Sequence, residues 1–144
     1  MSEQAWLPDV NVLIALANPG HSGFQSAVAW HRSIGNGRLL LCPVTEAGFV
    51  RLSVMPSVGG RSMCEALRGL TRIASLSCCA HLPIQNSWFS LIQPFASRLQ
   101  GYRQVTDALL LGLAIQSGSI LVTLDRRIEA LAGSEFKEHL LTLQ

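Results

Sequence analysis

The stretch WLPDVNVLIALA, residues 6–17, places a short apolar run, a single aspartate and a longer apolar run in direct succession. The first run is predicted to be a buried β-strand at 5–8, and the second a helix at 11–17. Asp9 stands at the junction between them. Carboxylates are rarely buried unless they are paired or bind something, so this position is unusual for an acid.

Three further stretches place an acid beside an apolar run at a similar junction. They contain Glu46 in LLLCPVTEAGFV, Asp107 in VTDALLLGLAI and Asp125 in ILVTLDRRI, whereas the other acidic residues have ordinary polar neighbours. Two unit charges about 4 Å apart repel by roughly 4 kcal/mol at an effective dielectric constant of about 20. If the fold gathers these four acids, either some are protonated or a cation neutralises them. The second possibility predicts a metal site.

Short apolar β-like runs alternate with longer helical patterns along the chain, which indicates an α/β fold with a parallel sheet. The hydrophobic helix over residues 107–117 should lie centrally, and Pro94 should kink or split the fifth helix. The predicted strands are 5–8, 38–42, 80–84, 119–124 and 139–143; the predicted helices are 11–17, 22–35, 45–54, 61–75, 87–100, 106–117 and 126–132. In open parallel sheets, ligands bind beyond the carboxyl ends of the strands, and all four acidic junctions fall at that edge.

The bulk composition indicates one globular domain over residues 1–144. Hydrophobic residues make up 49% of the chain and charged residues 14%, which excludes a disordered polypeptide. We expect no membrane span and no signal peptide, and the four cysteines lack zinc-site spacing. A reduced, cytoplasmic protein is the expectation.

Each acid also has a purely structural explanation as a helix cap or a first-turn residue. Thr45 and Thr106 each precede an acid, as an N-cap residue would, and Asn11 or Asp125 can cap the helix that follows it. Capping and metal binding are compatible, and four acids at one sheet edge are unlikely to be a coincidence. We therefore interpret the four together as a metal site.

The motifs LPDVNVLIAL, VTEAGFVRL, QVTDALLLGLA and LVTLDRRI, in this order, resemble those of PIN-domain ribonucleases, and most closely the VapC toxins of toxin–antitoxin pairs. The resemblance covers almost the whole chain. It implies a PIN-like fold: a five-stranded parallel sheet flanked by helices on both faces. It also implies an acidic site dependent on Mg²⁺, with Mn²⁺ as a substitute. Carried over by motif, the catalytic residues are Asp9, Glu46, Asp107 and Asp125, and the polar side chains that support them are Asn11, Thr106 and Thr123.

The residue types agree with this chemistry. Mg²⁺ prefers oxygen ligands and retains several waters, and a carboxylate cluster without His or Cys suits it better than zinc. Asp9, Asp107 and Asp125 are predicted to contact the metal directly or through water, while Glu46 completes the site or orients the attacking water. The arginines nearest to the acids in sequence are predicted to bind the substrate's phosphates; they are Arg51, Arg126 and Arg127. Equally, these arginines can form a solvated helix face or local salt bridges to the acids.

The resemblance implies three partners: a VapB-like antitoxin, an RNA substrate such as a tRNA or a ribosomal RNA loop, and a second copy in a homodimer. The helices at 45–54 and 61–75 are predicted to form the hairpin that supports dimer and antitoxin contacts. The alternatives are a PIN nuclease acting on DNA and a non-catalytic PIN binding module. A receiver domain and a haloacid-dehalogenase phosphatase are excluded, because the third strand ends without Asp and the first motif reads Asp9-Val10-Asn11 rather than Asp-x-Asp.

Overall fold

The computed structural model of the chain describes residues 3–144 and contains a five-stranded sheet in the order β3-β2-β1-β4-β5. All neighbouring strands pair in parallel, as predicted. The chain order reverses at the central strand β1, with β2 on one side and β4 on the other. The strands are β1 Ala5–Pro8, β2 Arg38–Leu41, β3 Cys79–His81, β4 Ile120–Thr123 and β5 Leu140–Thr142.

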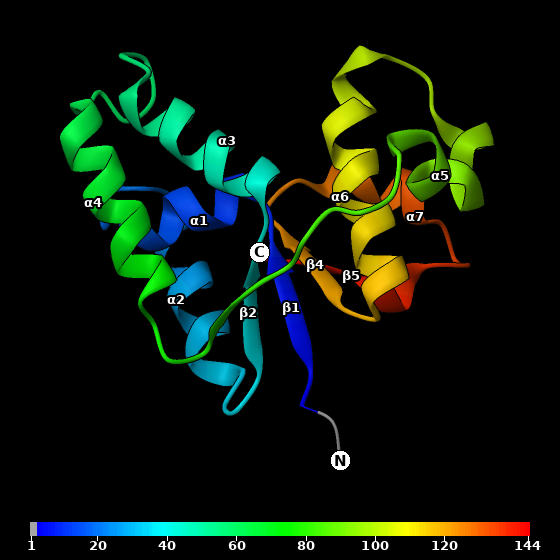
Figure 1. Cartoon of the computed structure of the whole chain (residues 1–144), viewed down its shortest axis with the longest axis horizontal. Helices are drawn as coiled ribbons and strands as arrows, with labels where there is room; N and C mark the ends of the chain where they lie inside the picture. The colour runs from blue at the N-terminus through cyan, green and yellow to red at the C-terminus, as the bar shows by residue number, and fades with distance from the viewer. Residues whose placement is uncertain (1–2) are drawn as a thin grey trace.

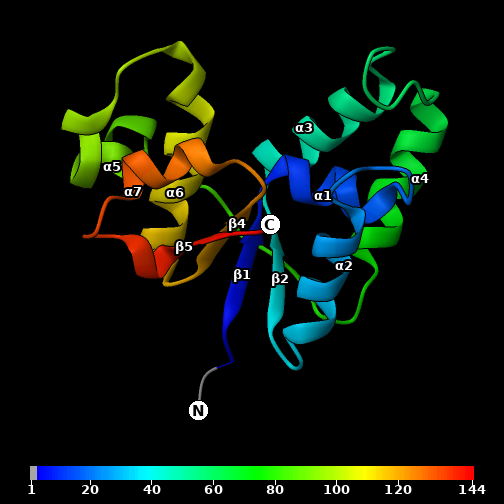
Figure 2. The same ribbon diagram turned by 180° about the vertical axis from the view of Figure 1, so that it is seen from behind.

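Helices cover both faces of the sheet, which confirms the predicted α/β architecture (Figure 1). One side carries α1 Val10–Ala17, α2 Phe24–Ser33, α3 Pro43–Val54 and α4 Met63–Ala74; the other carries α5 Trp88–Ile92, α6 Val105–Ser117 and α7 Glu129–Ala132. The view from behind shows the same two groups on either side of β1 and β2 (Figure 2). 3₁₀ segments lie at η1 Gln93–Arg98, η2 Tyr102–Gln104, η3 Arg126–Ile128 and η4 Lys137–His139.

The strands are mostly apolar because helices cover both faces of the sheet, and the exposed polar residues Arg38 and His81 stand at strand ends. Successive side chains of a strand point to opposite faces, so Leu40 packs in the core beneath α5 and α6, while Leu39 and Leu41 pack in the core beneath α1 and α2. The central helix α6 is buried from Ala108 to Ala114 except for partly buried Leu109, as its composition predicts.

The helix α6 lies close against α5 at Gly112. A Cβ atom at this position would stand 2.5 Å from the carbonyl oxygen of Leu91. Real Cβ atoms essentially never approach another heavy atom so closely, so only glycine allows the two helices this separation. The predicted break at Pro94 is confirmed: α5 ends at Ile92, and Phe95 has non-helical φ and ψ angles of −133° and 21°.

Three predicted helix caps are wrong. The N-cap of α3 is Cys42, and Pro43 begins the helix with the fixed φ that suits its first position. Thr45 lies one turn inside, where its hydroxyl bonds back to Cys42. Helix α6 begins at Val105, so Thr106 is not its cap. Asp9, rather than Asn11, caps α1. Asp125 caps the η3 turn, as expected.

Within residues 3–144, no helix is long and apolar enough to cross a membrane. The four cysteines are free.

Candidate acidic site at the carboxyl edge of the sheet

The sheet places Asp9 and Asp125 next to each other because they follow adjacent parallel strands. Pro8 at the end of β1 is paired with Val122 of β4. Asp9 follows β1 directly, and Asp125 follows β4 after one intervening residue. Asp107 enters from α6, in whose first turn it lies. Three acids separated widely in sequence thus meet at the strand-order reversal, where open α/β sheets bind ligands.

Asp9 is buried, with 8% of its surface exposed, and both of its carboxylate oxygens are held. The backbone N–H of Val10 donates to Oδ1 at 2.7 Å, and the hydroxyl of Thr123 donates to Oδ2 at 2.9 Å. The Val10 bond belongs to the N-terminus of α1, whose dipole favours a negative charge. Asp9 is therefore held in one orientation.

Thr123 joins Asp9 to its neighbours through a single hydroxyl. Besides donating to Asp9, Oγ1 accepts from the backbone N–H of Asp125 at 3.0 Å and from Nδ2 of Asn11 at 3.3 Å. One donor and two acceptor positions are all that a hydroxyl offers. Asn11 also accepts from the backbone N–H of Leu124 at 3.2 Å. The two predicted supporting residues Asn11 and Thr123 thus lie among the acids.

The charges of the three aspartates act on one another. Burial, together with the charges of Asp9 and Asp125, raises the pKa of Asp107 to about 6, and only the charge of Arg127 opposes this shift. Burial also raises the pKa of Asp9, against the hydrogen bonds from Thr123 and Val10. These shifts indicate a negative cluster with too little positive charge beside it.

Asp125 differs because Arg127 neutralises it. The guanidinium donates from Nε to Oδ1 at 3.0 Å and from Nη2 to Oδ2 at 2.8 Å. These bonds hold the pKa of Asp125 below its ordinary value. Of the two interpretations given for the arginines, local pairing with the acids describes Arg127.

Glu46 does not join this cluster in the structure. Its Oε1 lies 3.8 Å from Nδ1 of His81, at the end of β3, and it is not among the charges that shift the pKa values of the three aspartates. Within residues 3–144, no group of three or more His, Cys, Asp and Glu side chains forms a ready-made metal site. Of the four predicted acids, the three aspartates are thus linked by the effects of their charges on Asp107, and Glu46 is placed by its contact with His81.

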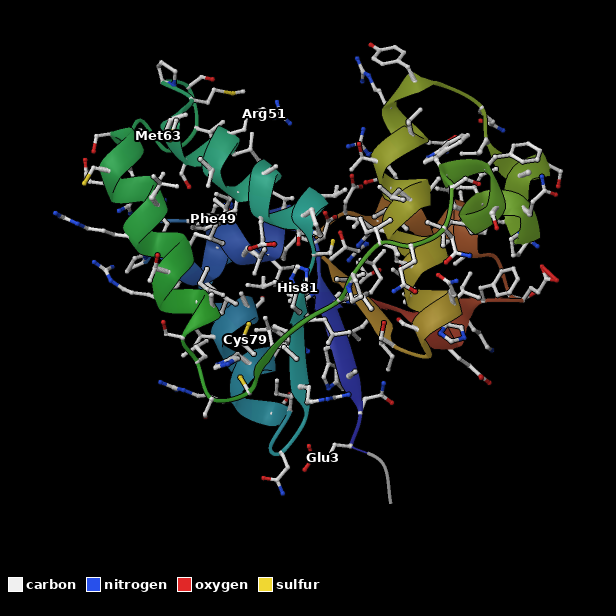
Figure 3. All side chains as sticks on the ribbon, viewed as in Figure 1. Glu3, Phe49, Arg51, Met63, Cys79 and His81 are labelled. Atoms are coloured by element: carbon white, nitrogen blue, oxygen red, sulfur yellow. The ribbon has the colours of Figure 1, made fainter. Side chains whose placement is uncertain are left out.

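Three other predicted residues are exposed. Thr106 is solvent-exposed in the first turn of α6, and its side chain makes no hydrogen bond among those found within residues 3–144. Arg126 is solvent-exposed on η3. Arg51 lies on α3, apart from His81 (Figure 3).

The sequence motifs do not include His81 or the exposed pair Tyr102 and Arg103, which contact Glu46 and line a pocket with Asp107, respectively. His81 comes from the edge strand β3, and its contact with Glu46 depends on the pairing of β2 with β3. Tyr102 and Arg103 line a pocket that also contains Asp107. The sequence GYRQ immediately before α6 indicates an exposed aromatic residue beside Asp107, because an aromatic residue in a polar loop is seldom part of a core.

The comparisons with known proteins agree with this geometry. Residues 7–134 match the model of the PIN domain family. The chain is 37% identical to ribonuclease VapC38 of Mycobacterium tuberculosis over 128 residues, covering 88% of this chain and 89% of that protein. It is 33% identical to ribonuclease VapC44 of the same species, covering 95% and 98% of the two chains.

Two solved structures share the fold. The M. tuberculosis toxin VapC20, described as cleaving the sarcin–ricin loop, superposes with a TM-score of 0.68 at 14% identity, covering 90% of this chain and 97% of that one. VapBC2 from Rickettsia felis, bound to a DNA fragment from its promoter, gives 0.62 at 12% identity, covering 98% and 100%. The family match spans nearly the whole chain, and the named relatives exceed 30% identity over most of their length. The chain therefore belongs to the PIN domain family, among the VapC proteins.

Proposed function

We propose that this protein is a metal-dependent endoribonuclease and the toxin of a VapBC-type pair. The observation that carries the proposal is the trio Asp9, Asp107 and Asp125 at the strand-order reversal, with the pKa of Asp107 raised to about 6. The names of the relatives, ribonucleases VapC38 and VapC44, supply the reaction class.

The residues fit Mg²⁺, or Mn²⁺ in its place, by donor chemistry. The trio offers only carboxylate oxygens, which are the ligands that these cations prefer. The charge also fits, because Arg127 alone opposes the repulsion at Asp107. Asp9, Asp107 and Asp125 would hold the ion after a side-chain rearrangement, since Arg127 now bonds both oxygens of Asp125. When bound, such an ion lowers the pKa of a water and offsets the charge of the scissile phosphate.

The chain's own residues position this chemistry. Thr123 and the N-terminus of α1 fix Asp9, and the same hydroxyl holds the backbone of Asp125. Glu46, which lies beside His81, would accept a proton from the attacking water. Holding the attacking water and the scissile phosphate in place would remove much of the entropic part of the activation barrier to cleavage.

Exposed arginines would bind the substrate's phosphates. Arg127 lies on Asp125, and Arg51 and Arg126 are free in solvent on α3 and η3. Guanidinium groups suit this role because they recognise phosphate with two parallel hydrogen bonds. The substrate we propose is a tRNA or a ribosomal RNA loop.

The proposed partner is a VapB-like antitoxin, with the toxin itself a homodimer. A groove of about 630 Å³ runs between α1, α2, α3 and α4; its floor includes Ile14 and Phe49, and arginines 61, 68 and 72 line it. Along the α3–α4 hairpin, Met63 and Leu67 are 54% and 50% exposed. Exposed apolar side chains beside a groove are typical of surfaces that bind another protein.

The test is cleavage of total tRNA and ribosomal RNA by the purified chain with Mg²⁺. Because a metal-activated water would attack phosphorus directly, we expect products with a 5′-phosphate and a 3′-hydroxyl, and loss of cleavage with EDTA. Asp107→Asn should abolish cutting, whereas Glu3→Gln, far from the site, should not. Cyclic-phosphate ends would refute the mechanism.

In cells, expression of this chain should arrest growth, and co-expression of the antitoxin should restore it. Preferential cleavage of a DNA strand would refute the RNA assignment and favour the alternative DNA nuclease. A chain that binds RNA but cuts neither polymer with any divalent cation would be a non-catalytic binding module.

A further inference from the structure

A second pocket, of about 300 Å³, adjoins the acidic trio. Residues 100–104, immediately before α6, form most of its wall, and Asp107, Arg127 and Leu131 complete it. A ligand that fills this pocket would therefore lie beside Asp107. The pocket belongs to the same edge of the molecule as the proposed reaction, but none of the loop residues has a role in the chemistry described so far.

Tyr102 presents an aromatic ring to solvent at the wall of this pocket. Its side chain is 81% exposed, the highest value among the large hydrophobic residues with exposed side chains in the described part of the chain. An aromatic ring that is buried on folding makes one of the larger contributions of any side chain to stability, and an exposed ring does not make this contribution. The position is therefore better explained by binding than by folding.

The guanidinium of Arg103 supports this ring. Its central carbon lies 5.7 Å from the centre of the Tyr102 ring, and its Nε donates to the Tyr102 hydroxyl at 3.3 Å. None of the salt bridges found within residues 3–144 involves Arg103. The pocket thus presents an aromatic surface and a positive charge that no carboxylate neutralises.

The loop that carries this pair is tied down at both ends. The backbone N–H of Gln100 donates to the side-chain oxygen of Gln104 at 2.7 Å, and the N–H of Gln104 donates to the carbonyl of Gly101 at 3.1 Å. Beyond it, the indole of Trp88 on α5 donates to the carbonyl of Val105 at 3.0 Å. A surface held in this way loses little conformational entropy on binding a ligand.

We infer that this pocket is a nucleotide subsite of the substrate strand, in which an unpaired base stacks on Tyr102 and its phosphate binds Arg103. The inference rests on the proposed function for its choice of RNA. Aromatic rings bind bases of unpaired strands through their faces, and guanidinium groups bind the accompanying phosphates. Because the pocket reaches Asp107, this nucleotide would adjoin the scissile phosphate, and Tyr102 would position the strand for cleavage.

Two measurements test the subsite without relying on cleavage. Tyr102 is the only tyrosine of the chain, so 3-fluorotyrosine gives a single ¹⁹F resonance. In the Asp107→Asn chain, which should bind RNA without cutting it, a short single-stranded RNA should shift this resonance. In the same background, Tyr102→Ala should weaken RNA binding by about 5- to 150-fold, as loss of one stacked base does, whereas Tyr102→Trp should retain it.

Phe89→Ala is the matched control, because Phe89 is also an exposed aromatic residue, at 64%, but does not line the pocket. It should bind RNA as the parent chain does. In the cleaving chain, Tyr102→Ala should act on KM more than on kcat, since Tyr102 holds the strand and not the reacting atoms.

The outcomes separate this inference from the proposed function. If RNA is cut but Tyr102→Ala neither weakens binding nor raises KM, the subsite is refuted and the nuclease stands. If no RNA is cut but its binding depends on Tyr102, the nuclease is refuted and the subsite stands. Tighter binding of a DNA strand of the same sequence, with the same dependence on Tyr102, would overturn the assignment of the pocket to RNA.

Discussion

Replacing Asp107 with asparagine should stabilise the metal-free protein at neutral pH. Burial and the charges of Asp9 and Asp125 raise the pKa of Asp107 to about 6, from 3.8 for a free aspartate. A carboxyl group whose pKa is raised on folding is costlier to ionise in the folded than in the unfolded state. Its ionisation therefore lowers the free energy of unfolding as the pH rises from about 4 to about 6, and the full loss persists above that range. Well below the free value of 3.8, where both states are protonated, the group has no effect.

The magnitude follows from the two pKa values. The difference between about 6 and 3.8 corresponds to roughly 3 kcal/mol. Because Asp107 is only half-buried, solvent screening reduces this to about 1–2 kcal/mol. Asp107→Asn should thus raise the free energy of unfolding by that amount at pH 7.5 in EDTA, and by only a small fraction of it at pH 4.

The assay is urea denaturation followed by tryptophan fluorescence at both pH values, with and without Mg²⁺. Under the proposed function, Mg²⁺ at a hundred times its dissociation constant raises the free energy of unfolding of the wild-type protein by about 2.7 kcal/mol, and that of the variant by less. With Mg²⁺, the wild-type protein should therefore be the more stable of the two. Glu3→Gln is the control for removal of a negative charge, because Glu3 is exposed at the end of the molecule where β1 begins (Figure 3). Equal effects of both substitutions, or an advantage of Asp107→Asn that persists undiminished at pH 4, would refute the reasoning.

Three further substitutions test the hydrogen bonds of Thr123 and the packing of α6 against α5. Thr123→Val removes a hydroxyl that makes three hydrogen bonds and leaves Asp9 with one fewer donor. It should lower the free energy of unfolding, measured by urea denaturation, by about 1–3 kcal/mol. The control is Thr142→Val at the paired position of β5, which removes a buried hydroxyl without a hydrogen-bond partner and should leave stability unchanged or raise it. Equal losses in the two variants would show that the hydrogen bonds of Thr123 are not what matters. Gly112→Ala should cost about 1–3 kcal/mol, because the new Cβ would stand 2.5 Å from the Leu91 carbonyl oxygen. A thermal unfolding midpoint equal to that of the wild type would contradict this packing.

The alternation of strands and helices was predictable because its signals are local. Each strand is a short apolar run, α6 is apolar on nearly every face, and Pro94 interrupts the helix that contains it. The meeting of Asp9 and Asp125 was predictable as well, since the carboxyl ends of parallel strands share one edge. The helix starts at Pro43 and Val105 were misassigned, because threonine before an acid resembles an N-cap wherever it occurs.

The sequence by itself thus determined a parallel α/β fold with acids at the carboxyl edge of its sheet. Only the tertiary structure decided which side chains meet there. The bond from Thr123 to Asp9 spans 114 residues, and Glu46 lies towards His81 because β2 pairs with β3. Likewise, Tyr102 lines one pocket with Arg127 and Leu131 only because α6 packs beside the turn that follows β4. Such contacts depend on strand pairing and helix packing over long separations, and periodicity, which reports on neighbours along the chain, does not contain them.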